Sequence, residues 1–75
     1  VRANPAADVA ANNLAMLLAA REDAASLDRA RDLAARFADS RNPAFLDTYG
    51  WVLFRRGETA QALPVLERAV ALAPD

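Results

Sequence analysis

The second half of this sequence repeats features of the first half at displacements of about 35 to 38 residues, and no other feature constrains the fold as strongly. Asn42-Pro43 repeats Asn4-Pro5, and Thr48-Tyr49-Gly50 stands in the same frame as Asn13-Leu14-Ala15. A period of this length is typical of solenoids, in which each unit stacks its apolar face on the next unit. The chain is therefore expected to consist of two similar structural units.

Apolar residues recur at steps of three and four in four segments, which is the period of an amphipathic α-helix. Most of these residues are Ala and Leu, which favour helices, and only 2 Gly interrupt the pattern. The predicted helices cover about 8–20, 27–38, 43–56 and 59–73. Short connections make consecutive helices antiparallel. We therefore predict an all-α fold of four antiparallel helices in one domain, 1–75, with helix-turn-helix repeats over about 5–42 and 43–75.

Helix ends are marked by residues that satisfy unpaired backbone groups. Ser26 is the expected N-cap of the second helix. Asn42 should cap the third helix with Pro43 in its first position, and Gly57 should supply the left-handed exit. In the fourth helix Pro64 removes one backbone hydrogen bond and is expected to bend the helix slightly. The remaining end signals are Asn4-Pro5 before the first helix and Pro74 after the fourth.

The apolar faces of these helices give the expected core. On the third helix this face comprises Leu46, Tyr49, Gly50 and Leu53, and on the fourth it comprises Ala62, Leu63, Leu66, Ala69 and Val70. Gly50 and Ala62 fall where two helices must approach closely. Phe45 and Val52 lie on a flank that is expected to meet the preceding helix pair. The larger apolar residues of the first helix are Val9, Leu14, Leu17 and Leu18.

Residues 43–75 follow, in order and spacing, the pattern of a known repeat unit. The matching positions are Leu46, Tyr49-Gly50, Leu53, Gly57, Ala62, Leu66, Ala69 and Pro74. Through these residues the segment resembles the tetratricopeptide repeat family, whose unit is a helix pair of about 34 residues. The first repeat matches less fully, since its inter-helix loop is about three residues longer than the family's and Ser40 replaces the usual final Pro. The stretch 43–52 also resembles bacterial members of the family.

The resemblance implies both a fold and a function. It implies a right-handed α-solenoid fragment, either of two repeats or from a longer array, that acts as a scaffold and binds a peptide or protein segment. In the family the first helix of each pair lines the concave groove. The groove positions are occupied by Asn12, Asn13, Met16, Asp47, Thr48, Trp51, Phe54 and Arg55, with Ala19 and Ala20 completing the stripe on the first helix.

Most of these residues also have a simpler interpretation. Trp51 and Phe54 fit a seam with a neighbouring repeat or a second copy of the chain as well as they fit a ligand. Solvent exposure without a ligand accounts for the two asparagines. Met16 fits the role of a gap-filler. Asp47 and Arg55 complement the dipole of their own helix.

The composition excludes most catalytic chemistry. The sequence contains no His, Cys or Lys, so no hydroxyl group has a base to activate it and thiolate metal sites are impossible. Asp28 and Asp32 alternate with Arg residues, as on a solvated helix face. We therefore expect no enzymatic activity, no metal and no cofactor.

The charge balance narrows the class of partner. A net charge of −1 gives no attraction to nucleic acid, and no segment has the length and apolarity of a membrane span. The expected partner is a protein or peptide. The alternative function is structural self-association as a homo-oligomer, because two repeats leave the end helices without neighbours. On the fourth helix the uncovered apolar strip is expected to carry Val65 and Leu72, beside the core-facing residues.

Overall fold

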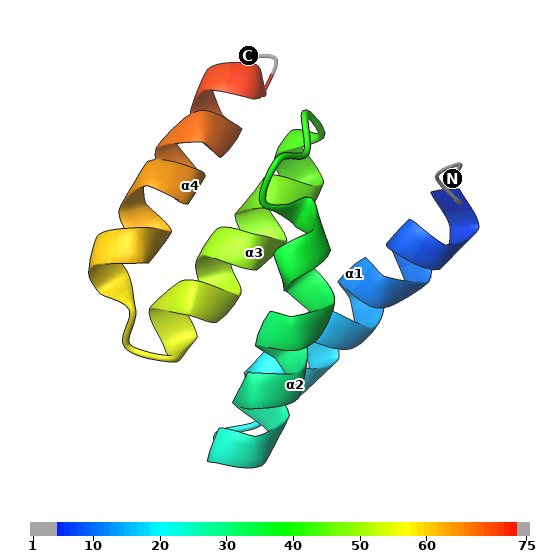
Figure 1. The fold of residues 1–75 in the computed structure, drawn as a ribbon, viewed down its shortest axis with the longest axis vertical. Helices are drawn as coiled ribbons and strands as arrows, with labels where there is room; N and C mark the ends of the chain where they lie inside the picture. The colour runs from blue at the N-terminus through cyan, green and yellow to red at the C-terminus, as the bar shows by residue number, and fades with distance from the viewer. Residues whose placement is uncertain (1–4, 74–75) are drawn as a thin grey trace.

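The computed structural model describes residues 5–73, and within that range all regular structure is helical. The elements are α1 (Pro5–Ala20), α2 (Ala24–Ala34), the short 3-10 helix η1 (Ala35–Phe37), α3 (Pro43–Arg55) and α4 (Thr59–Leu72). Figure 1 shows α3 in the middle of the molecule, with α4 along one side and α1 and α2 on the other. The predicted all-α fold class is confirmed, and the packing of adjacent helices is that of a repeat-like fragment.

The start of α2 differs from the prediction. Asp23, not Ser26, is the N-cap, and its Oδ2 atom accepts the Ser26 backbone N–H at 2.9 Å. Ser26 therefore lies inside the first turn, where it is the donor of the capping bond. This backbone donor, followed by a hydrogen bond from the Ser26 side chain, lowers the pKa of the Asp23 carboxyl below its ordinary value. The expected end signals Asn4 and Pro74 lie outside the described residues.

The ends of α3 agree with the prediction. The Asn42 Oδ1 atom accepts the Ala44 backbone N–H at 2.9 Å, and Pro43 occupies the first helical position. Gly57 has a φ of 84°, the left-handed conformation that an L side chain adopts only with strain. The following Glu58 N–H donates to the Leu53 carbonyl at 2.9 Å, which closes the end of the helix. Because α3 ends in this way at Gly57 and Glu58, α4 begins directly afterwards at Thr59 and the turn between the two helices is short.

The core between the two helix pairs is built largely from alanine. Its buried members are Ala11, Ala15, Leu18, Ala19, Ala30, Ala34, Phe37 and Val52, with Leu27, Leu33, Phe45 and Tyr49 packed against them. The Phe37 and Phe45 rings stack with their centroids 4.5 Å apart. Phe45 and Val52 therefore meet the preceding helix pair, as the sequence predicts. Small residues let the three helices approach, and the two aromatic rings fill the space that remains.

The α3–α4 pair is held together at a glycine. A Cβ atom placed on Gly50 would lie 2.5 Å from Leu66 Cδ2, so any larger residue at this position would force the Leu66 side chain to move. Leu46 and Leu53 are fully buried on either side of it. Among the described helices, α4 packs against α3 alone.

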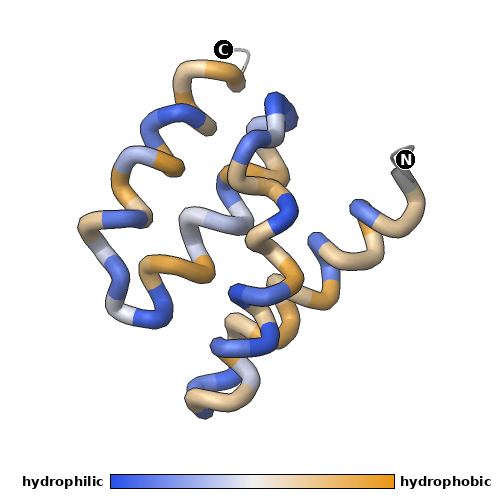
Figure 2. Tube along the Cα trace, in the orientation of Figure 1, coloured by the Kyte–Doolittle hydropathy of each residue, from blue (hydrophilic) through white to orange (hydrophobic). Residues whose placement is uncertain are grey.

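The orientation of α4 corrects the predicted core. Leu63 is 57% exposed and Val70 is 76% exposed, whereas Ala62 and Ala69 occupy the inner positions. The physical reason is that α4 meets α3 along Ala62, Leu66 and Ala69, with Leu66 against Gly50, so that Leu63 and Val70 fall on an outer flank of α4. The outward apolar strip is therefore Leu63 and Val70 rather than Val65. Figure 2 shows that apolar residues run through all the helices, α4 included.

The orientation of α1 shows the same effect. Val9, Leu14 and Leu17 are exposed, and only Leu18 of its larger apolar residues is buried. Alanines take the inner positions because α1 packs closely on both α2 and α3. Within residues 5–73, none of the helices has the length and apolarity needed to cross a bilayer.

Candidate protein-binding surface

Trp51 and Phe54 form an exposed aromatic pair on the outer side of α3. Their ring centroids lie 6.0 Å apart with an interplanar angle of 28°, and the side chains are 42% and 50% exposed. The remaining faces of α3 are covered, since Leu46, Val52 and Leu53 are buried. An α-helix whose outer face is also aromatic exposes more apolar surface than folding of this chain requires.

Arg55 connects this aromatic pair to the end of α1. Its guanidinium lies 5.6 Å from the centroid of the Trp51 ring, within the range of a cation–π contact. Its Nε–H donates to the Ala19 carbonyl oxygen at 3.2 Å. Ala19 is in the last turn of α1, a helix that lacks a basic residue in that turn. Arg55 therefore satisfies a carbonyl at the end of α1 that its own helix leaves unpaired.

The expected contact residues on α1 differ in their accessibility. Asn13 and Met16 are exposed, whereas Ala19, which was expected on the same stripe, is fully buried. Asn12 is half-buried, and its Oδ1 atom is buried without a hydrogen-bond partner among the described residues. Its Nδ2 atom lies 4.0 Å from the Met16 sulfur, which is a weak acceptor. An acceptor left in this state costs about 1–3 kcal/mol.

Thr48 does not lie with the exposed aromatic pair. Thr48 is only 4% exposed, and its hydroxyl donates to the Ala44 carbonyl oxygen of its own helix at 3.2 Å. It therefore offers no surface to a ligand. Asp47 is exposed one helical turn before Trp51 and on the same face of α3, and it also lines a shallow hollow on the α4 side of this helix. Of the eight predicted residues, Trp51 contacts Phe54 and Arg55, and Asp47 lies on the same face of α3 as the aromatic pair.

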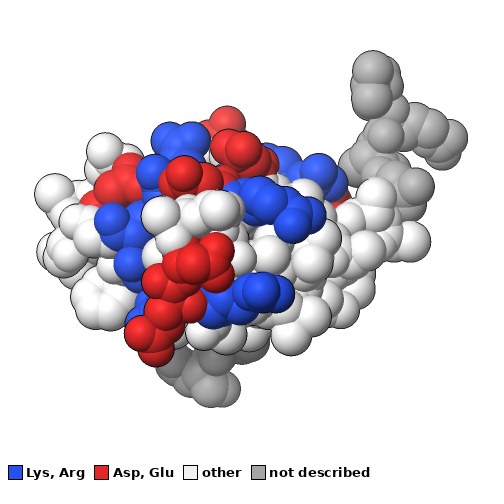
Figure 3. All heavy atoms as spheres, turned by 90° about the horizontal axis from the view of Figure 1, so that it is seen from below, with Lys and Arg blue, Asp and Glu red and all other residues white. Residues whose placement is uncertain are grey.

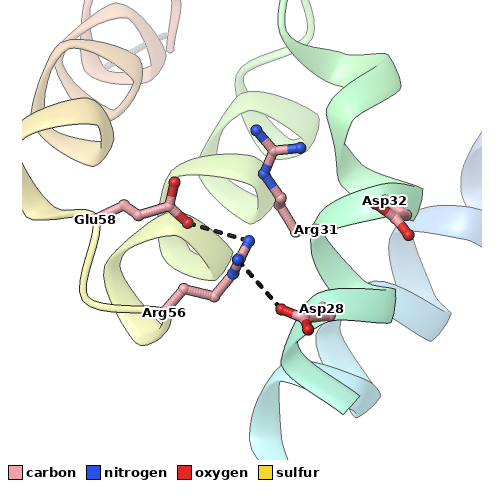
Figure 4. A pocket seen from close by; sticks show the side chains of 5 residues that line it. All are labelled: Asp28, Arg31, Asp32, Arg56 and Glu58. Carbon is pink, nitrogen blue, oxygen red and sulfur yellow. Dashed lines mark ion pairs between the residues drawn. The ribbon is translucent and has the colours of Figure 1, made fainter. Parts of the chain in front are cut away.

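A charged hollow of about 380 Å³ lies away from the aromatic pair, between α2 and the α3–α4 turn. Its lining consists of Asp28, Arg31, Asp32, Arg56 and Glu58 (Figure 4). The Arg56 guanidinium lies 3.2 Å from an Asp28 oxygen and 3.1 Å from Glu58 Oε2. Glu58 Oε2 has no hydrogen bond of good geometry, so its contact with Arg56 is an ion pair.

This arrangement links elements rather than preparing a reaction. Acid–base catalysis by two carboxylates needs one that holds a proton and one that is free to accept it. Here a single guanidinium holds both Asp28 and Glu58, and it ties α2 to the turn after α3. The sequence does not reveal this contact, because Asp28 and Arg56 are distant along the chain and no local pattern relates them. Among residues 5–73 there is also no group of three metal-ligating side chains.

The charges on the underside of the molecule are mixed. Figure 3 shows acidic and basic side chains next to one another across this face, with no stripe of a single sign. Such a face produces no extended field of one sign. The uncovered apolar residues outside the aromatic pair include Leu14 and Leu17 on α1 and Leu63 and Val70 on α4.

Comparison with known proteins adds no further assignment: no family model, no curated protein and no solved structure matches this chain.

Proposed function

We propose that this chain is a non-catalytic interaction module that binds a segment of another polypeptide across the outer face of α3 and the neighbouring flank of α1. The observation that carries the proposal is the exposed, stacked pair of Trp51 and Phe54. Aromatic residues of this kind supply much of the binding energy at protein interfaces. The resemblance of residues 43–75 to tetratricopeptide repeats supports the same function.

The chemistry of the surface favours an apolar segment. Arg55 already donates to the Ala19 carbonyl, so it is not available to grip a terminal carboxylate. An uncharged segment with an aromatic or branched apolar side chain therefore suits this face better than an acidic one.

Trp51 is the only tryptophan in the chain, so its fluorescence reports directly on the proposed surface. Peptides that bind the immobilised chain are selected from a display library of random short peptides. One enriched peptide is then titrated into a solution of the chain. We expect binding to shift the emission of Trp51. Trp51→Ala should weaken binding of the selected peptide, measured by calorimetry, by about 2 kcal/mol or more, roughly 30-fold in Kd.

A matched variant separates a local effect from a general one. Leu63→Ala also truncates an exposed apolar side chain, but on α4, and it should leave the affinity unchanged. If Trp51→Ala lowers the free energy of unfolding while the affinity per folded molecule stays constant, Trp51 belongs to the core and the proposal fails. The titration uses a protein concentration at which the emission of Trp51 in the absence of peptide does not depend on concentration, so that association of the chain with itself does not contribute to the signal.

A further inference from the structure

The junction between the two helix pairs is formed by one ridge and one groove. The ridge is a flank of α3, the α3 ridge, and it comprises Phe45, Thr48, Tyr49 and Val52. Val52 is fully buried, Phe45 stacks on Phe37, and Tyr49 packs against the same core. The groove that receives this ridge lies between α1 and α2, and its floor is small, with Ala19 and Ala34 fully buried.

The internal repeat places a second copy of the ridge on α1. At the displacement of 35 residues that aligns Gly50 with Ala15, the α3 ridge corresponds to Ala10, Asn13, Leu14 and Leu17, the α1 ridge. All of these residues are exposed, and Leu17 is 69% exposed. The same flank of the helix that is covered on α3 is therefore open on α1. The α1 ridge has the apolar character of a junction but no groove to fill.

The repeat also places a second groove between α3 and α4. Ala30 and Ala62 are both fully buried at corresponding places, and they align α2 with α4. The positions of Ala34 and Ala38 then correspond to Leu66 and Val70. The open groove formed in this way comprises Phe54, Leu63, Leu66 and Val70, and it continues into a shallow hollow of about 340 Å³ that Pro43, Ala44 and Ala73 help to line.

The ridge and the groove face opposite ends of the molecule. Arg68 donates to the Ala38 carbonyl oxygen at 2.7 Å, which places that flank of α4 toward the first helix pair. Leu63 and Val70 are on the other flank of α4 and point away from the first pair. The α1 ridge and the open groove, which correspond to the two sides of the internal junction, thus lie on opposite sides of the molecule.

We propose that a second copy of this chain occupies the open groove, with its α1 ridge seated between α3 and α4 of the first copy. The contact continues the internal junction from one molecule to the next. The side-chain sizes are complementary, since the inner junction sets a bulky ridge in a groove of alanines. The outer junction sets Leu14, Leu17 and small residues against the larger side chains of Phe54, Leu63 and Val70, which fill space that the alanines of the inner groove leave open.

This contact is head-to-tail, because the two surfaces that meet are different. A two-fold dimer requires one surface that is complementary to itself, and neither the ridge nor the groove has that shape. Each copy that joins leaves one ridge and one groove free at the ends of the assembly. The assembly therefore grows with concentration rather than stopping at two.

The test uses sedimentation velocity of the 75-residue chain across a hundredfold range of concentration, with two single variants. Leu17→Glu disables the ridge and Val70→Glu disables the groove, and both positions are exposed enough that folding should survive, which circular dichroism checks. We expect the mass of the wild-type assembly to rise with concentration. Each variant alone should require at least about tenfold more protein to associate. Met16→Glu, next to Leu17 but off the ridge, should assemble like the wild type.

Mixing the two variants decides the geometry. A head-to-tail contact predicts that the intact groove of Leu17→Glu accepts the intact ridge of Val70→Glu. The mixture should then form one-to-one complexes that grow no further. A mixture that associates no better than its components would overturn the proposal. A wild-type chain that stays monomeric over the whole range, or a Met16→Glu variant that is as defective as Leu17→Glu, would overturn it as well.

Discussion

The two helix pairs have the same outline but are held together by different side chains. At the displacement of 35 residues, Ala11 and Ala15 of α1 correspond to Leu46 and Gly50 of α3, all of them buried. The second pair combines fully buried leucines with one glycine that lets Leu66 cross the helix interface. The first pair uses alanine on both sides, and each alanine removes less apolar area from water than a leucine does. The first pair therefore depends on its junction with α3, where Phe37 meets Phe45, more than the second pair depends on the first.

The largest expected effect comes from making the second pair resemble the first. Leu46→Ala removes a fully buried side chain and leaves a cavity, so the free energy of unfolding should fall by about 2–5 kcal/mol. Leu46→Met keeps the volume and should cost less than about 1.5 kcal/mol. Urea denaturation at a low, fixed protein concentration measures both. If Leu46→Ala lowers the free energy of unfolding no more than Leu46→Met does, this side chain does not stabilise the second pair. The proposed difference between the two pairs would then be wrong.

Gly50 of α3 and Ala15 of α1 occupy corresponding positions, so exchanging glycine and alanine at them tests the difference between the two helix pairs. Gly50→Ala brings its Cβ to within 2.6 Å of Leu66 Cγ, and this overpacking costs about 1–3 kcal/mol. The gain in helix propensity, about 1 kcal/mol, offsets part of it. Ala15→Gly in the first pair loses propensity and gains no space, so it should cost about 1 kcal/mol.

A double-mutant cycle shows whether the contact with Leu66 is the reason. Leu66→Ala removes the atoms that the methyl group added by Gly50→Ala would strike, so the two substitutions should be less damaging together than their separate costs suggest. Thermal denaturation of the four proteins gives the coupling energy. Additive costs would mean that Gly50 is needed for its backbone rather than for the close approach of α4.

The smallest expected effect separates the two pairs by their helix caps. The cap of α2 is a carboxylate that titrates, whereas the cap of α3 is an amide that does not. Because the pKa of Asp23 in the folded chain lies below its ordinary value of 3.8, its stabilisation is complete above that value. It is lost as pH falls through the folded-state pKa.

Asp23→Asn keeps a good capping group but removes the titration, so its free energy of unfolding should fall less steeply than that of the wild type between about pH 5 and pH 2. Chemical denaturation over this range measures both slopes, and Asn42→Asp should steepen the dependence in the other pair. Equal slopes for wild type and Asp23→Asn would show that the capping bond does not favour the ionised form.

The sequence predicts those features that depend on local chemistry. The caps of α3, the left-handed Gly57 and the flank that carries Phe45 all follow from residue type and helical period, and the structure confirms them. The choice between Asp23 and Ser26 does not follow, because both are good N-caps and only the position of the chain decides which one accepts a backbone N–H.

The orientation of a helix about its axis depends on its neighbours, so the sequence alone does not predict which of its apolar side chains face inward. Leu63 and Val70 share an apolar arc with Ala62 and Ala69, and only the packing of α4 against α3 decides which of them turn inward. For the candidate site, Trp51 and Phe54 could be found because the core faces of α3 were already assigned. The burial of Thr48 and the reach of Arg55 to α1 could not, since both depend on how α1 packs beside α3.

The position of Arg55 has a consequence for thermodynamic linkage between the candidate surface and α1. One guanidinium group lies over the Trp51 ring and also completes the hydrogen bonding at the end of α1. A bound group that takes the place of the guanidinium over the indole competes with the hydrogen bond to Ala19. Binding on the aromatic face therefore weakens the ordering of the last turn of α1, and ordering of that turn weakens the binding. The coupling free energy is the same in both directions. A segment that leaves the Arg55 contact intact and packs only on Phe54 and the free edge of the indole avoids this cost.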